Sequence, residues 1–260
     1  NFYVKLPASI VNDPTTFVRF AVADKIVDVP MADALVSEKD GETRYRFSVE
    51  LNAKQIADNI TAQVMNENGA LGSALSYSLK QYCTNKLSDE SMADIAKALL
   101  NYGAAAQLFF NYNVENLAND VLDDADRILP DVDASTFAMS RTGSEEGISA
   151  KSATLMLESE VKVRVYFKLA EGADIADYTF TINGETAQIQ QNEKGYYLET
   201  APIAAKDLDE MFEFSVGGLT VTYGALSYVN SKLSSSDENT VYMAKALFAY
   251  YQAAEAYFAK

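Results

Sequence analysis

Four aspartates lie close together near the middle of the chain: Asp120, Asp123, Asp124 and Asp126. Carboxylate oxygens are the hard ligands that calcium prefers, so these four residues are the candidate ligands for a calcium ion. They lack the alternate-residue D-x-D-x-D-G pattern of a calcium loop. A solvated acidic linker is therefore the favoured interpretation of the cluster, so no cofactor is predicted, and a calcium site is the alternative.

Tyrosine is the aromatic residue most available for ligand binding, because the chain has 16 tyrosines and no tryptophan. Tyr45 lies on one face of a predicted strand, and Tyr196 and Tyr197 follow a predicted turn. A tyrosine near a loop can stack its apolar ring on a sugar and offer its hydroxyl to water or ligand. We take these three tyrosines as candidate ligand-binding residues, while Tyr102 and Tyr250 are expected to pack in a core.

Histidine is absent from the sequence, which removes the commonest general base, the Ser-His-Asp arrangement and the usual zinc ligands. A pair of carboxylates about 5–10 Å apart can hydrolyse a glycosidic bond without histidine. With 37 acidic residues in the chain, however, a chance pair is expected. We therefore assign no catalytic residue and expect no enzyme activity, and a histidine-free carboxylate glycoside hydrolase is the alternative.

The formal net charge of −16 disfavours nucleic acid and anionic lipid surfaces as partners, because both would be repelled. No apolar run approaches the roughly 20 residues of a membrane span, so direct insertion into a membrane is not expected. The single cysteine, Cys83, is expected to be a buried, inert thiol. The sequence begins with Asn1, and we expect it to be a monomeric piece of a longer polypeptide.

Two helical stretches resemble each other: AKALLNYGAAAQLFF from Ala96 and AKALFAYYQAAEAYF from Ala244 agree at 8 of 15 positions. Two shorter matches keep the same order. AKQI at Ala53 matches AKDL at Ala205, and ALSY at Ala74 matches ALSY at Ala225. A repeat spacing near 150 residues predicts two related domains rather than a solenoid, whose period would be about 20–50 residues.

Hydrophobic periodicity predicts short strands followed by helices in each half. Residues 43–50 and 161–169 alternate apolar and polar side chains, and turns are expected at Asp40-Gly41 and Asn183-Gly184. A helix is predicted from Ser73 onward, with Ser76 or Ser78 as N-cap. Residues 114–150 contain nine acids and two bases, which favours an acidic linker.

Several stretches resemble a known kind of module: NFYVKLP, GETRYRFSVEL, SLKQYC with the first closing helix, and LTVTYGALSYVN with the second. Together they resemble a duplicated module of unknown function that recurs in large secreted or cell-surface proteins of gut Gram-positive bacteria (Firmicutes). The likeness covers nearly the whole chain. It implies an extracellular or cell-surface location, and it carries no assigned catalytic or ligand residues.

The sequence thus predicts an α+β fold with two tandem related domains, each a small antiparallel sheet or sandwich closed by a C-terminal helix pair. The domains are residues 1–113 and 151–260, joined by the linker 114–150. The predicted function is a non-catalytic extracellular module of a larger bacterial surface protein, which serves as a spacer or recognition unit. Polysaccharide or another surface protein is the expected partner.

Overall fold

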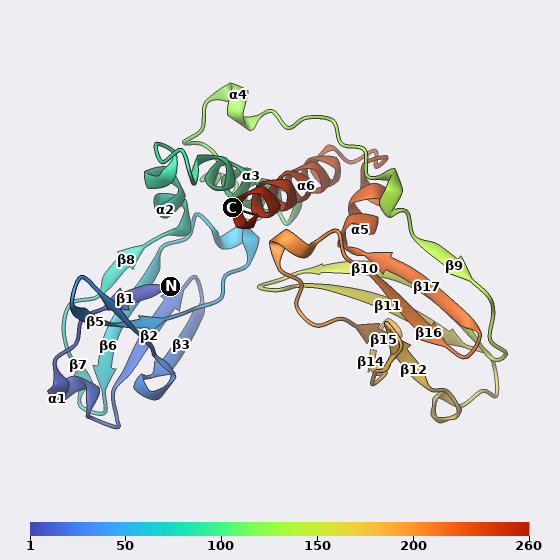
Figure 1. The fold of residues 1–260 in the computed structure, drawn as a ribbon, viewed down its shortest axis with the longest axis horizontal. Coiled ribbons are helices and arrows are strands. Elements are labelled where there is room, and N and C mark those ends of the chain that lie inside the picture. The colour runs from blue at the N-terminus through green and yellow to red at the C-terminus, as the bar shows by residue number, and fades with distance from the viewer. Residues whose placement is uncertain (260) are drawn as a thin grey trace. The chain divides into compact units, whose positions relative to one another are not determined.

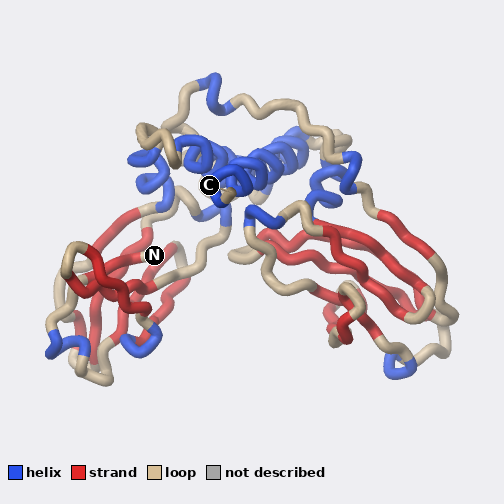
Figure 2. The backbone as a smooth tube through the Cα atoms, viewed as in Figure 1, coloured by secondary structure: helices blue, strands red, loops and turns tan. Residues whose placement is uncertain are grey.

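The computed structural model describes residues 1–259, and their contacts divide them into two compact units. Unit 1 comprises residues 1–51 and 55–85, and unit 2 comprises residues 52–54 and the chain from residue 86 onward. Antiparallel sheets and helices occur together, with a long helix at the C-terminal end (Figures 1 and 2). This confirms a mixed α and β fold built on antiparallel sheets.

Unit 1 consists of two antiparallel sheets that enclose one apolar core, with strand orders β1-β5-β4 and β3-β2-β6-β7, and β8 beside β6. The alternation of β2 places Val18, Phe20 and Val22 inside, where they meet Phe47 of the other sheet. The elements are β1 (Phe2–Val4), α1 (Ala8–Val11), β2 (Phe17–Val22), β3 (Lys25–Pro30), η1 (Met31–Asp33), β4 (Leu35–Lys39), β5 (Glu42–Phe47), β6 (Ile60–Asn66), β7 (Gly69–Ala70), β8 (Leu75–Tyr77) and α2 (Leu79–Lys86).

Unit 2 contains two further antiparallel sheets, β10-β11-β15-β14 and β13-β12-β16-β17-β9, which share a core with three helices. Val163 and Val165 of β11 meet Phe214 and Val221 of the facing sheet. Its strands are β9 (Ser140–Thr142), β10 (Ile148–Leu157), β11 (Val161–Leu169), β12 (Phe180–Ile182), β13 (Glu185–Thr186), β14 (Gln190–Asn192), β15 (Gly195–Glu199), β16 (Met211–Val216) and β17 (Leu219–Gly224). Its helices are η2 (Ala53–Gln55, whose last residue belongs to unit 1), α3 (Ala93–Phe109), α4 (Asp124–Arg127), η3 (Ser135–Phe137), η4 (Ile175–Asp177), η5 (Ala205–Asp207), α5 (Ala225–Lys232) and α6 (Glu238–Phe258).

The two longest helices, α3 and α6, pack against each other within unit 2. Ala104, Ala105 and Ala106 of α3 are fully buried, and the ring of Tyr102 stacks on that of Tyr250 with centroids 5.3 Å apart. Because alanine carries little bulk, the small-residue run in α3 lets another element approach closely, as the sequence predicts. The partner of α3 is the matching helix α6 rather than a sheet or helix of its own predicted module. Whether residues 1–113 form a folding unit of their own stays a prediction.

Segment 114–150, the expected linker, is bonded to these helices. The Asn119 side chain donates to Asn101 Oδ1 of α3 at 2.9 Å and to Tyr242 Oη of α6 at 3.1 Å. Further along, Glu145 accepts a hydrogen bond from the Gly218 backbone N–H at 2.7 Å. Gly217 has a positive φ of 52°, and a Cβ there would collide with the Glu145 carboxylate. The segment is therefore held at both ends by specific contacts of unit 2.

Two of the three repeated stretches form the same kind of element in both places. The AKQI and AKDL motifs lie in the 3-10 helices η2 and η5, and the longer stretches lie in α3 and α6. The ALSY stretch differs, because Leu75 belongs to strand β8 whereas Leu226 belongs to helix α5. A duplication stays a prediction. The helical spacing read from Ser73 onward is wrong for Leu75, which lies in β8, whereas α2 begins at Leu79, directly after the predicted N-cap Ser78.

Local turn and cap signals in the sequence are confirmed. Asp40 and Gly41 have φ values of 56° and 75°, and Asn183 and Gly184 have 52° and 81°, as a tight hairpin turn requires. Ser78 caps α2, because its hydroxyl accepts from the Gln81 N–H at 3.0 Å while the Gln81 side chain accepts from the Ser78 N–H at 3.0 Å.

Candidate functional site

The three tyrosines selected from the sequence do not form one ligand platform. Tyr45 lies on β5 and packs against the core of unit 1. Tyr196 and Tyr197 are neighbours on β15 of unit 2 and therefore point to opposite faces of the sheet, Tyr196 opposite Phe167 and Tyr197 opposite Tyr166. Tyr197 is only 7% exposed, and the Arg164 guanidinium lies 4.4 Å from its ring centroid. The Arg164 guanidinium thus covers one face of the Tyr197 ring, where a ligand would have to stack.

The four aspartates of the candidate calcium site are spread over separate interactions. Asp126 pairs with Lys97 at 3.0 Å, and Asp124 lies 3.7 Å from Arg127. Asp123 precedes α4, and the Asp120 carbonyl accepts from Arg127 at 2.7 Å. Across residues 1–259, no group of three or more acidic or cysteine side chains is close enough to hold a metal ion. Calcium binding at these aspartates stays a prediction.

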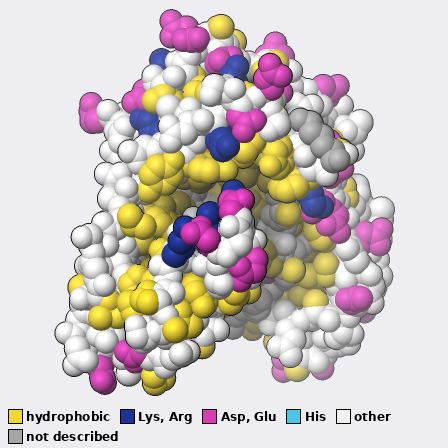
Figure 3. Space-filling view, turned by 60° about the vertical axis from the view of Figure 1, so that its left-hand side comes forward, with side chains coloured by type: hydrophobic (Ala, Val, Ile, Leu, Met, Phe, Trp, Pro, Cys, Tyr) yellow, Lys and Arg dark blue, Asp and Glu magenta, His cyan; other side chains and the backbone are white. Residues whose placement is uncertain are grey.

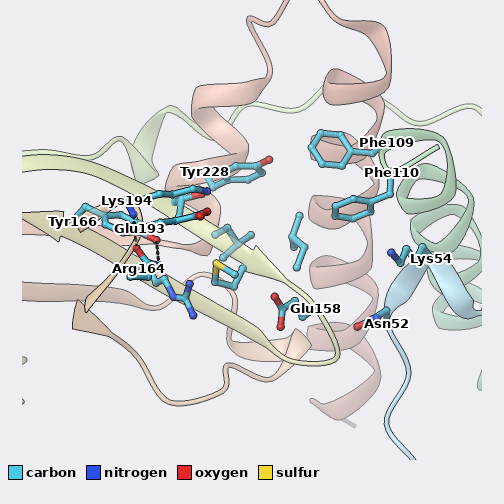
Figure 4. Close-up of a pocket in the computed structure, with 15 residues that line it drawn as sticks. Asn52, Lys54, Phe109, Phe110, Glu158, Arg164, Tyr166, Glu193, Lys194 and Tyr228 are labelled. Carbon is cyan, nitrogen blue, oxygen red and sulfur yellow. Dashed lines mark hydrogen bonds between the residues drawn. The ribbon is translucent and has the colours of Figure 1, made fainter. Parts of the chain in front are cut away.

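A groove of unit 2 lies beside β10 and encloses about 650 Å³. We call it the β10 groove. Its floor is formed by Thr154–Leu157 of β10 and the following Glu158, and its sides come from other elements. The side residues used below are Lys54, Phe109, Phe110, Arg164, Tyr166, Asn192, Glu193, Lys194 and Tyr228. In Figure 4, Phe109 and Phe110 lie across the groove from Arg164, Tyr166 and Lys194.

The polar side of the β10 groove is built on the outer face of its sheet. Arg164 pairs with Glu199 directly across from it on β15. The rings of Tyr166 and Tyr197 lie 5.4 Å apart between centroids, and the Asn192 amide donates to Tyr166 Oη at 3.1 Å. The β14–β15 turn is fixed by Lys151, which donates to the Lys194 carbonyl at 2.7 Å. These contacts hold the polar side chains in defined positions.

The aromatic side of the β10 groove is formed by the end of α3. Phe109 and Phe110 pack edge to face with centroids 4.9 Å apart, and Phe110 is 43% exposed. The Lys54 ammonium lies 5.3 Å from the Phe110 ring centroid and 5.1 Å from that of Tyr112. Such cation–π contacts restrain the lysine beside the rings. The groove therefore offers an exposed aromatic ring together with a positioned cation.

Charge in the β10 groove differs from that of the whole chain. The lining contains three cations, Lys54, Arg164 and Lys194, and two acids, Glu158 and Glu193. The whole chain has 21 lysines and arginines and 37 acids. On the face drawn in Figure 3, acidic side chains are scattered rather than gathered in one patch. Arg164 is already paired with Glu199, so the remaining lining charges, Lys54 and Lys194 against Glu158 and Glu193, are balanced rather than acidic like the whole chain.

Sequence reasoning missed this groove, because its residues come from β10, β11, α3, α5 and the β14–β15 turn. One signal was available in the sequence. Residues Ala153–Leu157 carry no charge, and the nearest charged residues on either side are Lys151 and Glu158. Only the sheet order shows that this run lies at an edge.

Smaller grooves are also present in the described part of the chain. One, of about 370 Å³, lies in unit 1 beside β1 and is largely apolar, with Tyr3 and Leu75 more than half exposed. Another, of about 380 Å³, lies in unit 2 between α4 and α6, beside Ile128, and its lining includes Tyr242, Arg127 and Lys245. Both enclose less space than the β10 groove.

No known protein-family model matches the chain, and no curated protein sequence shows significant similarity to it. In the described part of the chain, no helix has both the length and the apolar character needed to cross a membrane.

Cys83 is expected to resist alkylation in the folded protein. It is 2% exposed on α2, and burial raises the pKa of its thiol to about 11 from 9.0. A shift of two pKa units lowers the thiolate fraction at pH 8 about 100-fold, so iodoacetamide should label the native protein at least that much more slowly than the urea-unfolded protein. The raised pKa contributes stability below pH 9, which is lost as the pH rises toward 11. Equal labelling rates, followed by mass spectrometry, would contradict this burial.

Proposed function

We propose that the chain is a non-catalytic recognition module, and that it binds a segment of a glycan or protein in the β10 groove. The observation that carries this proposal is the groove itself, where an exposed Phe110 ring faces fixed polar and charged side chains. Aromatic surface with a few placed polar groups is typical of ligand sites. The resemblance to bacterial surface modules supports an extracellular setting within a larger protein, which is part of the same proposal.

A glycoside hydrolase remains the second candidate, for one specific reason. Glu158 and Glu193 both line the β10 groove, and paired carboxylates are the catalytic groups of such enzymes. The recognition proposal differs in its outcome, because a recognition module retains a polysaccharide without cleaving it.

A polysaccharide panel distinguishes the two candidates. The purified chain is incubated with soluble and insoluble polysaccharides, and reducing ends and retained protein are both measured. We expect no release of reducing ends, and any retention should fall roughly 2- to 12-fold in Phe110→Ala, since stacking on an aromatic ring contributes roughly 0.5–1.5 kcal/mol. Phe258→Ala serves as control, because Phe258 is also exposed and lies outside the groove. Release of reducing ends that disappears in Glu158→Gln or Glu193→Gln would establish the enzyme instead.

A further inference from the structure

β10 is an edge strand, and its open edge forms the floor of the β10 groove. Within residues 1–259 it pairs with β11 on one side, and the sheet order places no strand on the other. An unpaired edge presents a row of backbone N–H and C=O groups that can pair with another strand. The backbone groups of Thr154–Leu157 therefore border the same space that the groove encloses.

Other edge strands of the described sheets carry features that disfavour pairing with a further strand, namely charged side chains, proline or a β-bulge, which we call guards. Three edge strands exceed three residues: β3, β4 and β10. β3 carries Lys25 and Asp28 and ends at Pro30, and β4 carries Glu38 and Lys39. The first half of β10 is guarded by Lys151 and by a bulge between Ala150 and Ser152.

The second half of β10 lacks these guards. Ala153–Leu157 contains no charge and no proline, and its threonine, leucines and methionine suit an extended backbone. This unguarded run lies where the β10 groove is found. An unguarded edge beside a lined groove is the arrangement used for adding a peptide strand to a sheet.

Side chains around the groove indicate what kind of strand would fit. Successive side chains of an added strand point to opposite faces of the sheet. One face of β10 carries Leu155 and Leu157, which belong to the same hydrophobic cluster as Phe109 and Tyr228. The face of Thr154 carries Arg164 directly across on β11, and Lys194 borders the groove.

We infer that the β10 edge binds an extended segment of a partner protein as an added strand, in which apolar residues alternate with polar residues. Apolar side chains of the segment would contact Phe109, Phe110 and Tyr228, and polar ones would lie near Asn192 and Lys194. The occupant is a strand because the open side of β10 offers backbone donors and acceptors in the spacing that only another extended backbone matches. Thr154–Leu157 spans about 10 Å, which pairs with about four residues. This inference rests on the proposed recognition function.

The test uses a phage-displayed library of random nine-residue peptides, selected on the immobilised full chain. We expect enriched peptides with apolar residues at alternate positions and polar residues between them. Synthetic copies should lose at least tenfold in affinity when alternate backbone nitrogens are methylated, because methylation removes the ladder donors and keeps the side chains. Affinity is measured by isothermal titration calorimetry.

A variant locates the binding site. Thr154→Glu places a negative charge on the open edge, and it should weaken the enriched peptides at least tenfold. Thr186→Glu places the same charge on β13, another exposed edge of unit 2, and should change affinity less than twofold. Should Thr154→Glu lose the native circular dichroism spectrum, the methylated peptides decide alone.

Three outcomes would overturn the inference. The first is a library without enriched peptides, and the second is unchanged affinity for methylated copies. The third is a dimer of the free chain in sedimentation that Thr154→Glu converts to monomer, since the edge would then pair with a second copy. Retention of a polysaccharide with no peptide binding would contradict the inference and would still support the proposed function. Binding of neither would contradict both and favour a spacer.

Discussion

Replacing Gln107 by leucine is expected to lower the free energy of unfolding of unit 2 by roughly 3–5 kcal/mol, because three backbone partners lose their hydrogen bonds. Gln107 is fully buried in α3. Its carbonyl accepts from the Ala118 N–H at 2.7 Å, and its amide donates to the carbonyls of Asn113 and Asn116 at 3.1 and 2.9 Å. Leucine has a similar size and can replace none of these bonds.

Urea denaturation followed by circular dichroism measures this effect. Gln188→Leu is the matched control, since Gln188 is exposed in the same unit, and it should change the free energy of unfolding by less than about 0.5 kcal/mol. The loss in Gln107→Leu reports how firmly the segment after α3 is held. A loss below 1 kcal/mol would mean that residues 113–118 contribute as little as a free linker would.

Phe20→Ala and Phe214→Ala are each expected to destabilise one unit by roughly 3–5 kcal/mol and to leave the other unchanged. Both rings are fully buried, Phe20 in the core of unit 1 and Phe214 in the core of unit 2. Removing a buried ring loses the free energy gained by transferring it from water to the core, and the cavity that remains destabilises the unit further. Because the two cores share no residues, the cost should stay within one unit.

Differential scanning calorimetry checks this prediction, since two units with separate cores should give two transitions. Phe20→Ala should lower one transition temperature, and Phe214→Ala the other. Each variant is the control for its counterpart. A single transition that shifts equally in both variants would show that the chain unfolds as one cooperative body.

Local patterns determined individual strands of this protein. The alternation in residues 161–169 corresponds to β11 with the same bounds, because one buried and one outer face force a two-residue period. The alternation in residues 43–50 corresponds to β5, which ends earlier, at Phe47. The turn residues at Asp40 and Asn183 set two hairpins, since few residues adopt a positive φ without strain. The closing helices were also evident from their apolar stripes, although α6 begins at Glu238, earlier than the repeated stretch.

Partner choice was decided only by the tertiary structure. The sequence showed that α3 carries a run of small residues to which another element can approach closely. It could not show that this element is α6, because secondary-structure propensity carries no information about which distant segment packs against a helix. The same four letters, Ala-Leu-Ser-Tyr, lie on a strand at Leu75 and in a helix at Leu226, since hydrogen bonds to β6 stabilise the first as a strand.

The candidate site shows the same limit. Tyr196 and Tyr197 are adjacent in sequence, and the strand period alone separates their side chains onto opposite faces. Ala153–Leu157 can be recognised in the sequence as a run without charges, but what the run does depends on which strands lie beside it. In a sheet interior such a run is ordinary, and at an edge beside an open groove it is a place for binding. Sheet order, which long-range pairing determines, made that difference.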